Sequence, residues 1–419
     1  MKYHIIIFGC QMNYADAERV DSVMNSLGYV KTGKMEDANV VIIVACSVRQ
    51  HAIEKIYGLN RRFEATRKMH PLKTILTGCV LESDKKKMLK FFDYIFPINE
   101  LQKLPKLLGK RKPIDIKEYL SIAPAHNSRF QAYVPISNGC NQFCSYCVVP
   151  YARGREVCRD PKEIIEECKC LIEKGYKEII LLGQTINSYA HKGVNFSELL
   201  RRIDNISGDF WIRFLSSHPN FFTPKLIEVW KNSKHITPYL HLAVQSGNNA
   251  ILKKMNRKYT VGKYLSIIAK MKKAIPDITI STDIIVGYCG ETKKQFENTA
   301  RLMKKVKFDM VYIAKYSPRK GTVAEKMYKD TIAWEEKKKR HETLNTILAK
   351  TALENNKKMI NKPVRVLVET AGDGFFMAKT DNFKNVKIIV KVNSDLVGKF
   401  IVVKIIKASS WGLTARLMN

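Results

Sequence analysis

The first 110 residues alternate between short apolar runs and longer segments in which apolar residues recur with helical spacing. The short runs are rich in β-branched residues. They predict strands at 3–8, 40–44 and 74–76, with helices such as 15–27 and 49–68 between them. Strands that are apolar on both faces and are joined by helices form parallel sheets that helices cover on both sides. We therefore expect an N-terminal parallel α/β sheet domain.

A second series of β/α repeats begins near residue 131. Its expected strands are six apolar runs, at 132–136, 178–182, 211–215, 240–244, 278–286 and 311–316. Helical segments such as 161–174 and 293–305 separate them, and a basic helical stretch at 333–360 follows. Six repeats predict an incomplete (β/α)6 barrel, a fold in which the loops after the strands carry the chemistry.

The last sixty residues change to short β-branched runs separated by turns rich in Gly and Asn. The expected strands are 364–369, 376–380, 386–392, 400–406 and 414–417, which together predict a small all-β barrel. Residues 361–419 hold ten Lys or Arg and four Asp or Glu, a net charge of +6, and small basic barrels commonly bind RNA. The expected domains of this α/β chain are 1–113, 126–355 and 358–419.

Charge points to the same kind of partner. The 419 residues include 72 Lys and Arg against 39 Asp and Glu, a net charge of +33, which indicates a polyanion such as nucleic acid. Solvated lysine-rich surfaces are the simpler alternative, and the runs 85–87 and 337–340 are expected to be exposed helix faces. No run approaches the ~18 apolar residues of a membrane span, and no targeting segment is visible. The protein is therefore expected in the cytoplasm, where thiols stay reduced, so its ten cysteines need a role other than disulfides.

The sharpest candidate for such a role is the triplet Cys140, Cys144 and Cys147, on the loop after the first barrel strand. Three thiolates on one short loop can hold three corners of a cubane iron–sulfur cluster and leave the fourth iron open to a ligand. A structural zinc site is the alternative, but it needs four ligands, usually as two pairs. Cys168 and Cys170 do not supply the second pair, because they are expected to point apart on one helix.

A second trio consists of Cys10, Cys46 and Cys79, each of which follows an apolar strand and a small residue. Parallel strands end at one edge of their sheet, so the three thiols are expected to converge there. Buried cysteines packed as small hydrophobes are the alternative. The repeated position in three successive units favours a second cluster site.

With these motifs the sequence resembles the methylthiotransferase family of radical S-adenosylmethionine enzymes across essentially its whole length, and most closely the MiaB-type tRNA methylthiotransferases. The terminal barrel resembles a TRAM domain, an RNA-binding module. The matching segments are 9–13, 45–49, 77–79, 139–154, 182–189, 217–219, 244–247, 281–287 and 315–319.

The resemblance implies two 4Fe–4S clusters. The one on Cys140, Cys144 and Cys147 would bind S-adenosylmethionine and yield a 5′-deoxyadenosyl radical. The one on the second trio would supply the methylthio group for C2 of N6-isopentenyladenosine next to the anticodon. Further cofactor contacts are implied for Tyr146, Gly183, Gln184, Asn187, Ser217, His218 and Gln245.

Some of these roles have simpler alternatives. His218 could merely cap a backbone group, and Arg153 and Arg155 could meet tRNA phosphate or only solvent. The chain also departs from the family pattern, with Cys289, Ala243 and Lys320 where proline is usual and Cys158 where serine is common. These changes affect loop stiffness and substrate positioning rather than the cysteine trios.

The implied partners are the anticodon stem-loop of tRNA and a reducing electron donor such as flavodoxin or ferredoxin, with the enzyme itself a monomer. Two related substrates remain open, threonylcarbamoyladenosine in tRNA and an aspartate of a ribosomal protein. A non-catalytic, metal-containing RNA-binding protein is the alternative of a different class.

Overall fold

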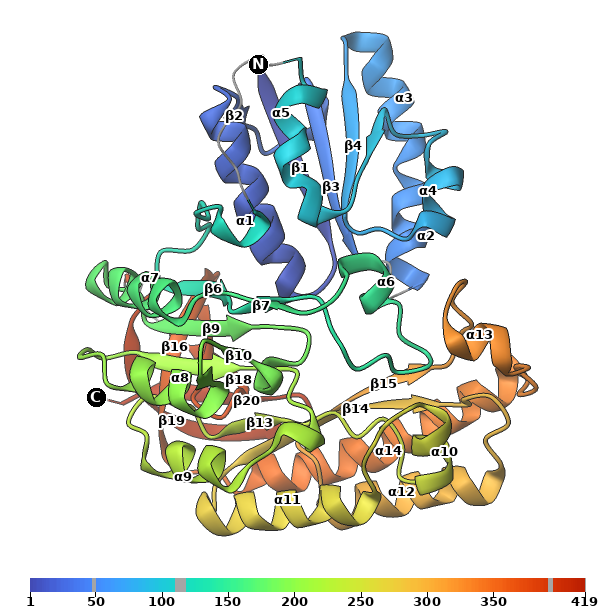
Figure 1. Ribbon diagram of the computed structural model, residues 1–419. Helices are drawn as coiled ribbons and strands as arrows, with labels where there is room; N and C mark the ends of the chain where they lie inside the picture. The colour runs from blue at the N-terminus through green and yellow to red at the C-terminus, as the bar shows by residue number, and fades with distance from the viewer. Residues whose placement is uncertain (47–49, 110–117, 391–394, 419) are drawn as a thin grey trace.

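The computed structural model describes residues 1–46, 50–109, 118–390 and 395–418. Its N-terminal part is a five-stranded sheet in the order β2-β1-β3-β4-β5, with every neighbouring pair parallel (Figure 1). The strands are β1 (Lys2–Phe8), β2 (Val30–Lys31), β3 (Val40–Cys46), β4 (Lys73–Cys79) and β5 (Tyr94–Ile95). The helices are α1 (Gln11–Ser26), α2 (Gln50–Gly58), α3 (Asn60–Met69), α4 (Glu82–Met88) and α5 (Leu104–Leu107).

Helices cover both faces of this sheet, as the apolar strands predict. All seven residues of β3 are buried. One face packs against α1 and α5, and the other against α2 and α3. The helix expected at 49–68 is two helices, because Gly58, a poor helix former, ends the first of them. Residue 49, like Ser47 and Val48 of the family motif, lies outside the described residues.

The central part has six parallel strands in chain order, which form the incomplete barrel that the sequence predicts. Two three-stranded sheets, β12-β9-β6 and β13-β14-β15, are joined by parallel bridges from Ile212 to Ile236 and from Ser217 to Leu242. The strands are β6 (Gln131–Pro135), β9 (Glu178–Leu182), β12 (Trp211–Phe214), β13 (Tyr239–His241), β14 (Thr279–Val286) and β15 (Met310–Lys315). β13 is shorter than the expected 240–244, because its pairing in the ladder ends at His241.

The longer helices that follow these strands pack on the outside of the barrel (Figure 1). They are α7 (Pro161–Glu173), α8 (Phe196–Asp204), α9 (Pro224–Asn232), α11 (Val261–Ala274), α12 (Lys293–Val306) and α14 (Trp334–Lys357). The shorter helices α6 (Val149–Arg153), α10 (Asn249–Lys254) and α13 (Val323–Met327) lie in the loops beyond the carboxyl ends of the strands. The expectation that 337–340 is an exposed helix face holds for Lys338 and Lys339 but is wrong for the two residues that flank them. Lys337 and Arg340 are buried against the barrel, where they pair with Asp330 and Glu291.

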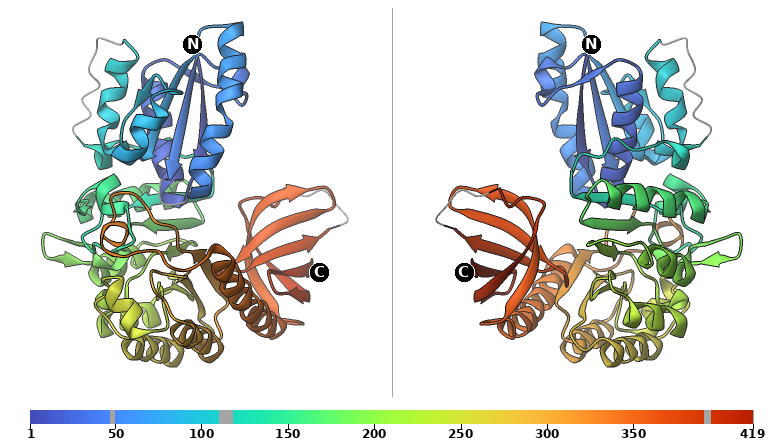
Figure 2. Two further views of the ribbon diagram at one scale, coloured as in Figure 1. Left: turned by 90° about the vertical axis from the view of Figure 1, so that its right-hand side faces the viewer. Right: turned by 90° about the vertical axis from the view of Figure 1, so that its left-hand side faces the viewer.

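The C-terminal part is a closed five-stranded barrel in the order β16-β17-β18-β20-β19, next to α14 and to one side of the core (Figure 2). Its strands are β16 (Pro363–Gly372), β17 (Phe375–Thr380), β18 (Asn385–Ile389), β19 (Phe400–Ser409) and β20 (Gly412–Leu417). The strand expected at 386–392 ends at Ile389, and residues 391–392 lie outside the described residues. No helix in the described parts of the chain is long and apolar enough to cross a membrane.

Candidate active site

The triplet Cys140, Cys144 and Cys147 lies on the loop that follows β6, beyond the carboxyl ends of the barrel strands. The loop turns at Gly139, whose φ is +86°. A Cβ at this position would lie 2.1 Å from the carbonyl oxygen of Arg155. Only glycine can adopt this backbone angle and also lie so close to a neighbouring carbonyl group. Gly139 therefore determines the backbone conformation at the start of the triplet loop.

The other end of the loop is anchored by distant parts of the barrel. Ser145 donates its backbone N–H to the carbonyl oxygen of Met255 over 3.1 Å, and its Oγ to that of Lys254 over 2.8 Å. Ala324, in α13, donates its N–H to the carbonyl oxygen of Ser145 over 2.7 Å. The segment that carries the three thiols is therefore held by both α10 and α13.

The three thiols lie close together beside a fixed positive charge. Cys140 and Cys144 are buried and Cys147 is partly buried. Burial and the neighbouring thiols raise the pKa of Cys147 to about 12. The buried guanidinium of Arg257 donates to the Sγ of Cys144 over 3.5 Å and to the carbonyl oxygen of Ala243 over 2.7 Å. A cation beside thiols favours their deprotonated, metal-binding form.

Three predicted cofactor contacts surround the triplet. Tyr146 packs against an apolar cluster that includes Tyr288. Gly183 directly follows β9, and a Cβ there would lie 2.8 Å from the Oγ of Ser137. The Oε1 of Gln184 is buried and accepts no hydrogen bond from any described residue. A buried acceptor without a donor is costly, so this oxygen is suited to a polar ligand.

Asn187 and His218 are paired with each other. The Oδ1 of Asn187 accepts the N–H of His218 over 2.8 Å, and its Nδ2 donates to the carbonyl oxygen of His218 over 3.0 Å. The Nδ1 of His218 accepts the N–H of Asn220 over 3.1 Å, so this histidine does cap a backbone group. Burial and the charges of Arg257 and Lys263 lower the pKa of His218 to about 2, which keeps the ring neutral.

Ser217 and Gln245 also lie beyond the strand ends. The Oγ of Ser217 is buried without a hydrogen-bond partner among the described residues. Gln245 has a φ of +67°, and its backbone N–H donates to the carbonyl oxygen of Asp283 over 2.8 Å. A positive φ is uncommon for a residue with a side chain and is frequent at functional sites. Ala243 donates its N–H to the carbonyl oxygen of Ser217 over 3.3 Å, a bond that the usual proline could not form.

The second trio converges at the edge of the N-terminal sheet. Cys46 and Cys79 end β3 and β4 and stand directly opposite each other in the parallel register, and Cys10 begins α1 just after β1. Contact with Cys46 and burial raise the pKa of Cys79, and burial and Cys79 raise that of Cys10. Gly78 has a φ of +107°, and a Cβ there would lie 2.3 Å from the carbonyl oxygen of Ala45. The small residues before these cysteines allow the strand ends to pack closely.

Arg153 meets neither tRNA phosphate nor solvent, and both of those expectations are wrong. Its side chain is 1% exposed and forms a bidentate ion pair with the fully buried Asp16. Its Nε donates to the Sγ of Cys79 over 2.9 Å, and its Nη1 to the Oδ1 of Asn138 over 2.9 Å. Arg155 is exposed, with its guanidinium 4.3 Å from the centre of the Phe143 ring. Arg153 is therefore a link between the two cysteine trios.

The sheet edge that carries the second trio lies against the part of the barrel that carries α6, just after the triplet loop (Figure 1). Cys79 packs in one apolar cluster with Val148 and Ala152, which lie just after Cys147. Among the described residues, no three His, Cys, Asp or Glu side chains converge closely enough to hold a single metal ion. In a cubane each thiolate has an iron of its own, so its cysteines are spread more widely than zinc ligands.

The remaining four cysteines lie elsewhere. Cys168 is in the barrel core, and Cys170 is on the same helix, α7. Cys158 is partly buried, and Cys289 packs beside Tyr288.

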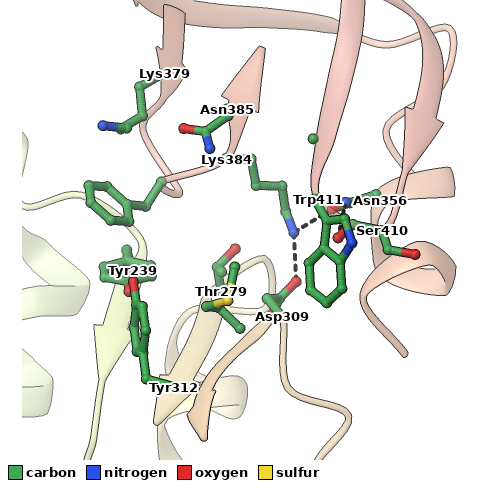
Figure 3. Close-up of a pocket in the computed structure, with 13 residues that line it drawn as sticks. Tyr239, Thr279, Asp309, Tyr312, Asn356, Lys379, Lys384, Asn385, Ser410 and Trp411 are labelled. Atoms are coloured by element: carbon green, nitrogen blue, oxygen red, sulfur yellow. Dashed lines mark hydrogen bonds and ion pairs between the residues drawn. The ribbon is translucent and has the colours of Figure 1, made fainter. Parts of the chain in front are cut away.

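A separate pocket lies where the C-terminal barrel meets the start of the core strands (Figure 3). Lys384 crosses it and donates to Asp309 over 2.7 Å and to Asn356 over 2.8 Å. Two of its lining aromatic residues are well exposed, Tyr312 at 48% and Trp411 at 54%. This pocket combines aromatic rings with lysines and is made by different residues from those around the cysteines.

Three family models match the chain, one for each part of the fold. The Radical SAM superfamily matches residues 134–303, the Uncharacterized protein family UPF0004 matches 2–96, and the TRAM domain matches 357–418.

Relatives that match nearly the whole chain share one name, tRNA-2-methylthio-N(6)-dimethylallyladenosine synthase. The protein of that name from Caldicellulosiruptor saccharolyticus is 39% identical, over 97% of this chain and 90% of its own length. The one from Clostridium novyi is 39% identical, over 100% and 96%. The one from Dictyoglomus thermophilum is 36% identical, over 100% and 99%.

Solved structures share the fold at low identity. The radical S-adenosylmethionine methyltransferase TsrM from Kitasatospora setae, solved with cobalamin and a 4Fe–4S cluster, has a TM-score of 0.55 at 12% identity. The match covers 75% of this chain and 74% of TsrM. The cobalamin-dependent enzyme OxsB reaches a TM-score of 0.54 at 10% identity, over 82% of this chain and 56% of its own.

Proposed function

The chain belongs to the tRNA-2-methylthio-N(6)-dimethylallyladenosine synthase family of radical S-adenosylmethionine enzymes, and we propose that it places a methylthio group on C2 of N6-isopentenyladenosine next to the anticodon of tRNA. The observation that carries the proposal is the presence of two cysteine trios on adjoining parts of the fold. One trio alone is enough for radical chemistry. The second, at the edge of a separate sheet, provides for sulfur insertion.

We assign Cys140, Cys144 and Cys147 as ligands of a 4Fe–4S cluster that binds S-adenosylmethionine. With that cofactor bound, the site supplies a carbon-centred radical able to take hydrogen from an unactivated C–H bond. The protein holds the ligands through Gly139 and Ser145, and Arg257 places a positive charge beside Cys144.

The polar groups left without partners support this cofactor. The buried Oε1 of Gln184 and Oγ of Ser217 have no partner among the described residues. With the cofactor bound, the first would accept from a donor such as its amino group, and the second would pair with a ligand oxygen. Gly183 lets the backbone after β9 pack against Ser137, beside the triplet loop. Gln245 and Tyr146 complete the proposed contacts, whereas Asn187 and His218 act by tying the loops after β9 and β12 together.

We assign Cys10, Cys46 and Cys79 as ligands of a second 4Fe–4S cluster, which is the source of the methylthio sulfur. Three thiols from separate strand ends meet at one sheet edge, and the glycines before Cys10 and Cys79 let those strand ends pack closely against Asn13 and Ala45. Cys79 packs against Val148 and Ala152, at the start of α6, so the proposed sulfur source adjoins the loop that carries the radical site.

The C-terminal barrel offers a basic surface for the RNA. Lys387 and Lys407 flank Thr414 across three neighbouring strands, and Arg416 pairs in register with Lys404. These side chains alternate with the buried interior residues of β18, β19 and β20, so they share the outward face. The other cations of the barrel that face the core are used in ion pairs, namely Arg365, Lys379 and Lys384.

Trp411, in the turn between β19 and β20, is exposed and lines the pocket between the C-terminal barrel and the core (Figure 3). Exposed aromatic rings next to lysines are the usual means of stacking single-stranded bases. We propose that the face made by Lys387, Lys404, Lys407 and Arg416, with Trp411, holds the tRNA while its anticodon loop enters the radical site. The enzyme works as a cytoplasmic monomer and takes electrons from a flavodoxin or ferredoxin.

Nucleoside analysis of tRNA from a strain that lacks the gene tests this function. We expect loss of methylthio-isopentenyladenosine, accumulation of isopentenyladenosine, and restoration by the intact gene. Restoration should fail with a gene that carries Cys46→Ala. Unchanged methylthio-isopentenyladenosine would refute the proposal, and loss of methylthio-threonylcarbamoyladenosine would assign the chain to the related substrate.

A further inference from the structure

Arg153 occupies an unusual position for a cation. It is buried between two domains, and four hydrogen bonds fix its guanidinium. Three of them go to Asp16 and Asn138, which would satisfy a purely structural arginine. The fourth, from Nε to the Sγ of Cys79 over 2.9 Å, is aimed at a sulfur atom of the second trio.

Asp16 is itself held in place from several sides. Asn13 donates to it over 3.2 Å, and the hydroxyl of Tyr119 donates to its other oxygen. Asn13 also accepts the N–H of Cys10 over 3.1 Å. One network therefore connects two cysteines of the trio to a cation and to an anion, both of which are buried.

A charge in such a place acts strongly on its surroundings. Electrostatic interactions are much stronger in a buried, low-dielectric region than in water. Hydrogen bonds to cluster sulfur and nearby charge are among the means by which proteins set the reduction potential of iron–sulfur clusters. Arg153 is on α6, which begins two residues after Cys147, so it also couples the position of the triplet loop to the second trio.

We propose that the Arg153–Asp16 pair sets the reduction potential of the cluster held by Cys10, Cys46 and Cys79. Arg153 is a positioning residue that raises this potential, and Asp16 lowers it. This inference rests on the proposed function, because it requires a cluster on that trio. Reduction adds negative charge to the cluster. A neighbouring cation therefore favours the reduced form, and a neighbouring anion opposes it.

The test uses the whole chain with Cys140, Cys144 and Cys147 all changed to Ala, so that only the second trio can hold iron. The midpoint potential of its cluster is measured by an anaerobic redox titration followed by electron paramagnetic resonance. In this background Arg153→Met should shift the potential downward and Asp16→Asn should shift it upward. Arg153→Lys, which keeps the charge but loses the planar fork, should shift it less than Arg153→Met.

Opposite shifts separate an electrostatic role from a structural one, since loosening the domain boundary has no reason to move the potential in opposite directions. Arg155→Met is the matched control: it removes a more exposed arginine two residues away and should leave the potential unchanged. If Arg153→Met does not fold, Asp16→Asn and Arg153→Lys still decide the question. No upward shift in Asp16→Asn, or shifts of the same sign in both pair members, would overturn the inference. Absence of iron in the parent triple variant would instead refute the second cluster itself.

Discussion

Arg213 and Glu178 form an ion pair in which both side chains are buried, with 2.7 Å between Nε and Oε1. The same guanidinium donates to the carbonyl oxygens of Asp381 over 2.8 Å and of Thr380 over 3.4 Å, both in the C-terminal barrel. Its carbon lies 4.5 Å from the centre of the Phe383 ring. Arg213 thus joins a buried ion pair of the core to the turn that follows β17 in the C-terminal barrel.

Arg213→Met should therefore destabilise the protein strongly, because it leaves Glu178 buried without its cation. Breaking a buried pair by removing one partner costs roughly 3–5 kcal/mol. Arg365→Met is the control, since Arg365 and Asp209 form an exposed pair, worth about 0–1 kcal/mol. Urea unfolding followed by circular dichroism measures both. Equal destabilisation in the two variants would show that the buried pair has no special role.

Acidification should weaken the fold through His218. Its pKa in the folded protein is lowered to about 2 by burial and by Arg257 and Lys263, whereas an unfolded histidine titrates near 6.5. At such a pH the unfolded chain binds a proton at His218 that the folded chain does not bind. The free energy of unfolding therefore falls as the pH drops below about 6.5. The slope is at most about 1.4 kcal/mol per pH unit from this group.

The variant His218→Asn should reduce that slope while keeping an acceptor for the N–H of Asn220. Denaturant midpoints between pH 7 and pH 5, roughly the range spanning the unfolded histidine pKa, provide the measurement. The partly exposed His191→Asn is the control and should leave the slope as it is. An unaltered slope in His218→Asn would mean that this ring takes up a proton as readily in the folded protein as in the unfolded chain.

Charge reversal on the outward face of β18, β20 and β19 should weaken tRNA binding. We expect Lys387→Glu combined with Lys407→Glu to raise the Kd and to flatten its dependence on salt, by about 0.7–0.9 in logarithmic slope for each phosphate that the barrel no longer neutralises. The control is Lys225→Glu, an exposed lysine on the outer helix α9. Filter binding of an anticodon stem-loop at several salt concentrations gives both quantities. If the control flattens the slope as much as the double variant, binding at this face is non-specific.

The two trios should separate in their metal content. Cys46→Ala should lose about half of the iron but still cleave S-adenosylmethionine, because the triplet on the barrel loop is intact. Cys144→Ala should keep the iron of the second trio but no longer cleave S-adenosylmethionine. Anaerobic iron and sulfide analysis, together with 5′-deoxyadenosine formation, distinguishes them. The assigned roles would be contradicted if Cys46→Ala no longer cleaved S-adenosylmethionine, or if it still transferred the methylthio group.

Much of this arrangement could be predicted from the sequence, because its signals are local. Each of Cys10, Cys46 and Cys79 follows an apolar strand, and parallel strands must end at one edge. The five strands of the C-terminal barrel are similarly marked by alternation and turns. The fold class and the two cysteine trios follow from such patterns together with the family resemblance.

The buried arginines could not be predicted, because their partners are far away in sequence. Arg153 contacts a cysteine 74 positions and an aspartate 137 positions away, and Arg257 contacts a cysteine 113 positions away. In a chain with 72 Lys and Arg, a local pattern does not tell these residues from solvated ones. The expectation for Lys337 and Arg340 is wrong for the same reason, since their partners Asp330 and Glu291 come from outside their helix.

The central claim is methylthiolation of a particular nucleoside, and reconstitution with a defined substrate tests it most directly. The anaerobically reconstituted protein is incubated with S-adenosylmethionine, a reductant and an anticodon stem-loop that carries isopentenyladenosine, and the digested RNA is analysed by mass spectrometry. The account predicts methylthio-isopentenyladenosine with the intact chain and none with Cys79→Ala. It would be contradicted if the isopentenyl substrate stayed unmodified while a stem-loop carrying threonylcarbamoyladenosine gained the methylthio group.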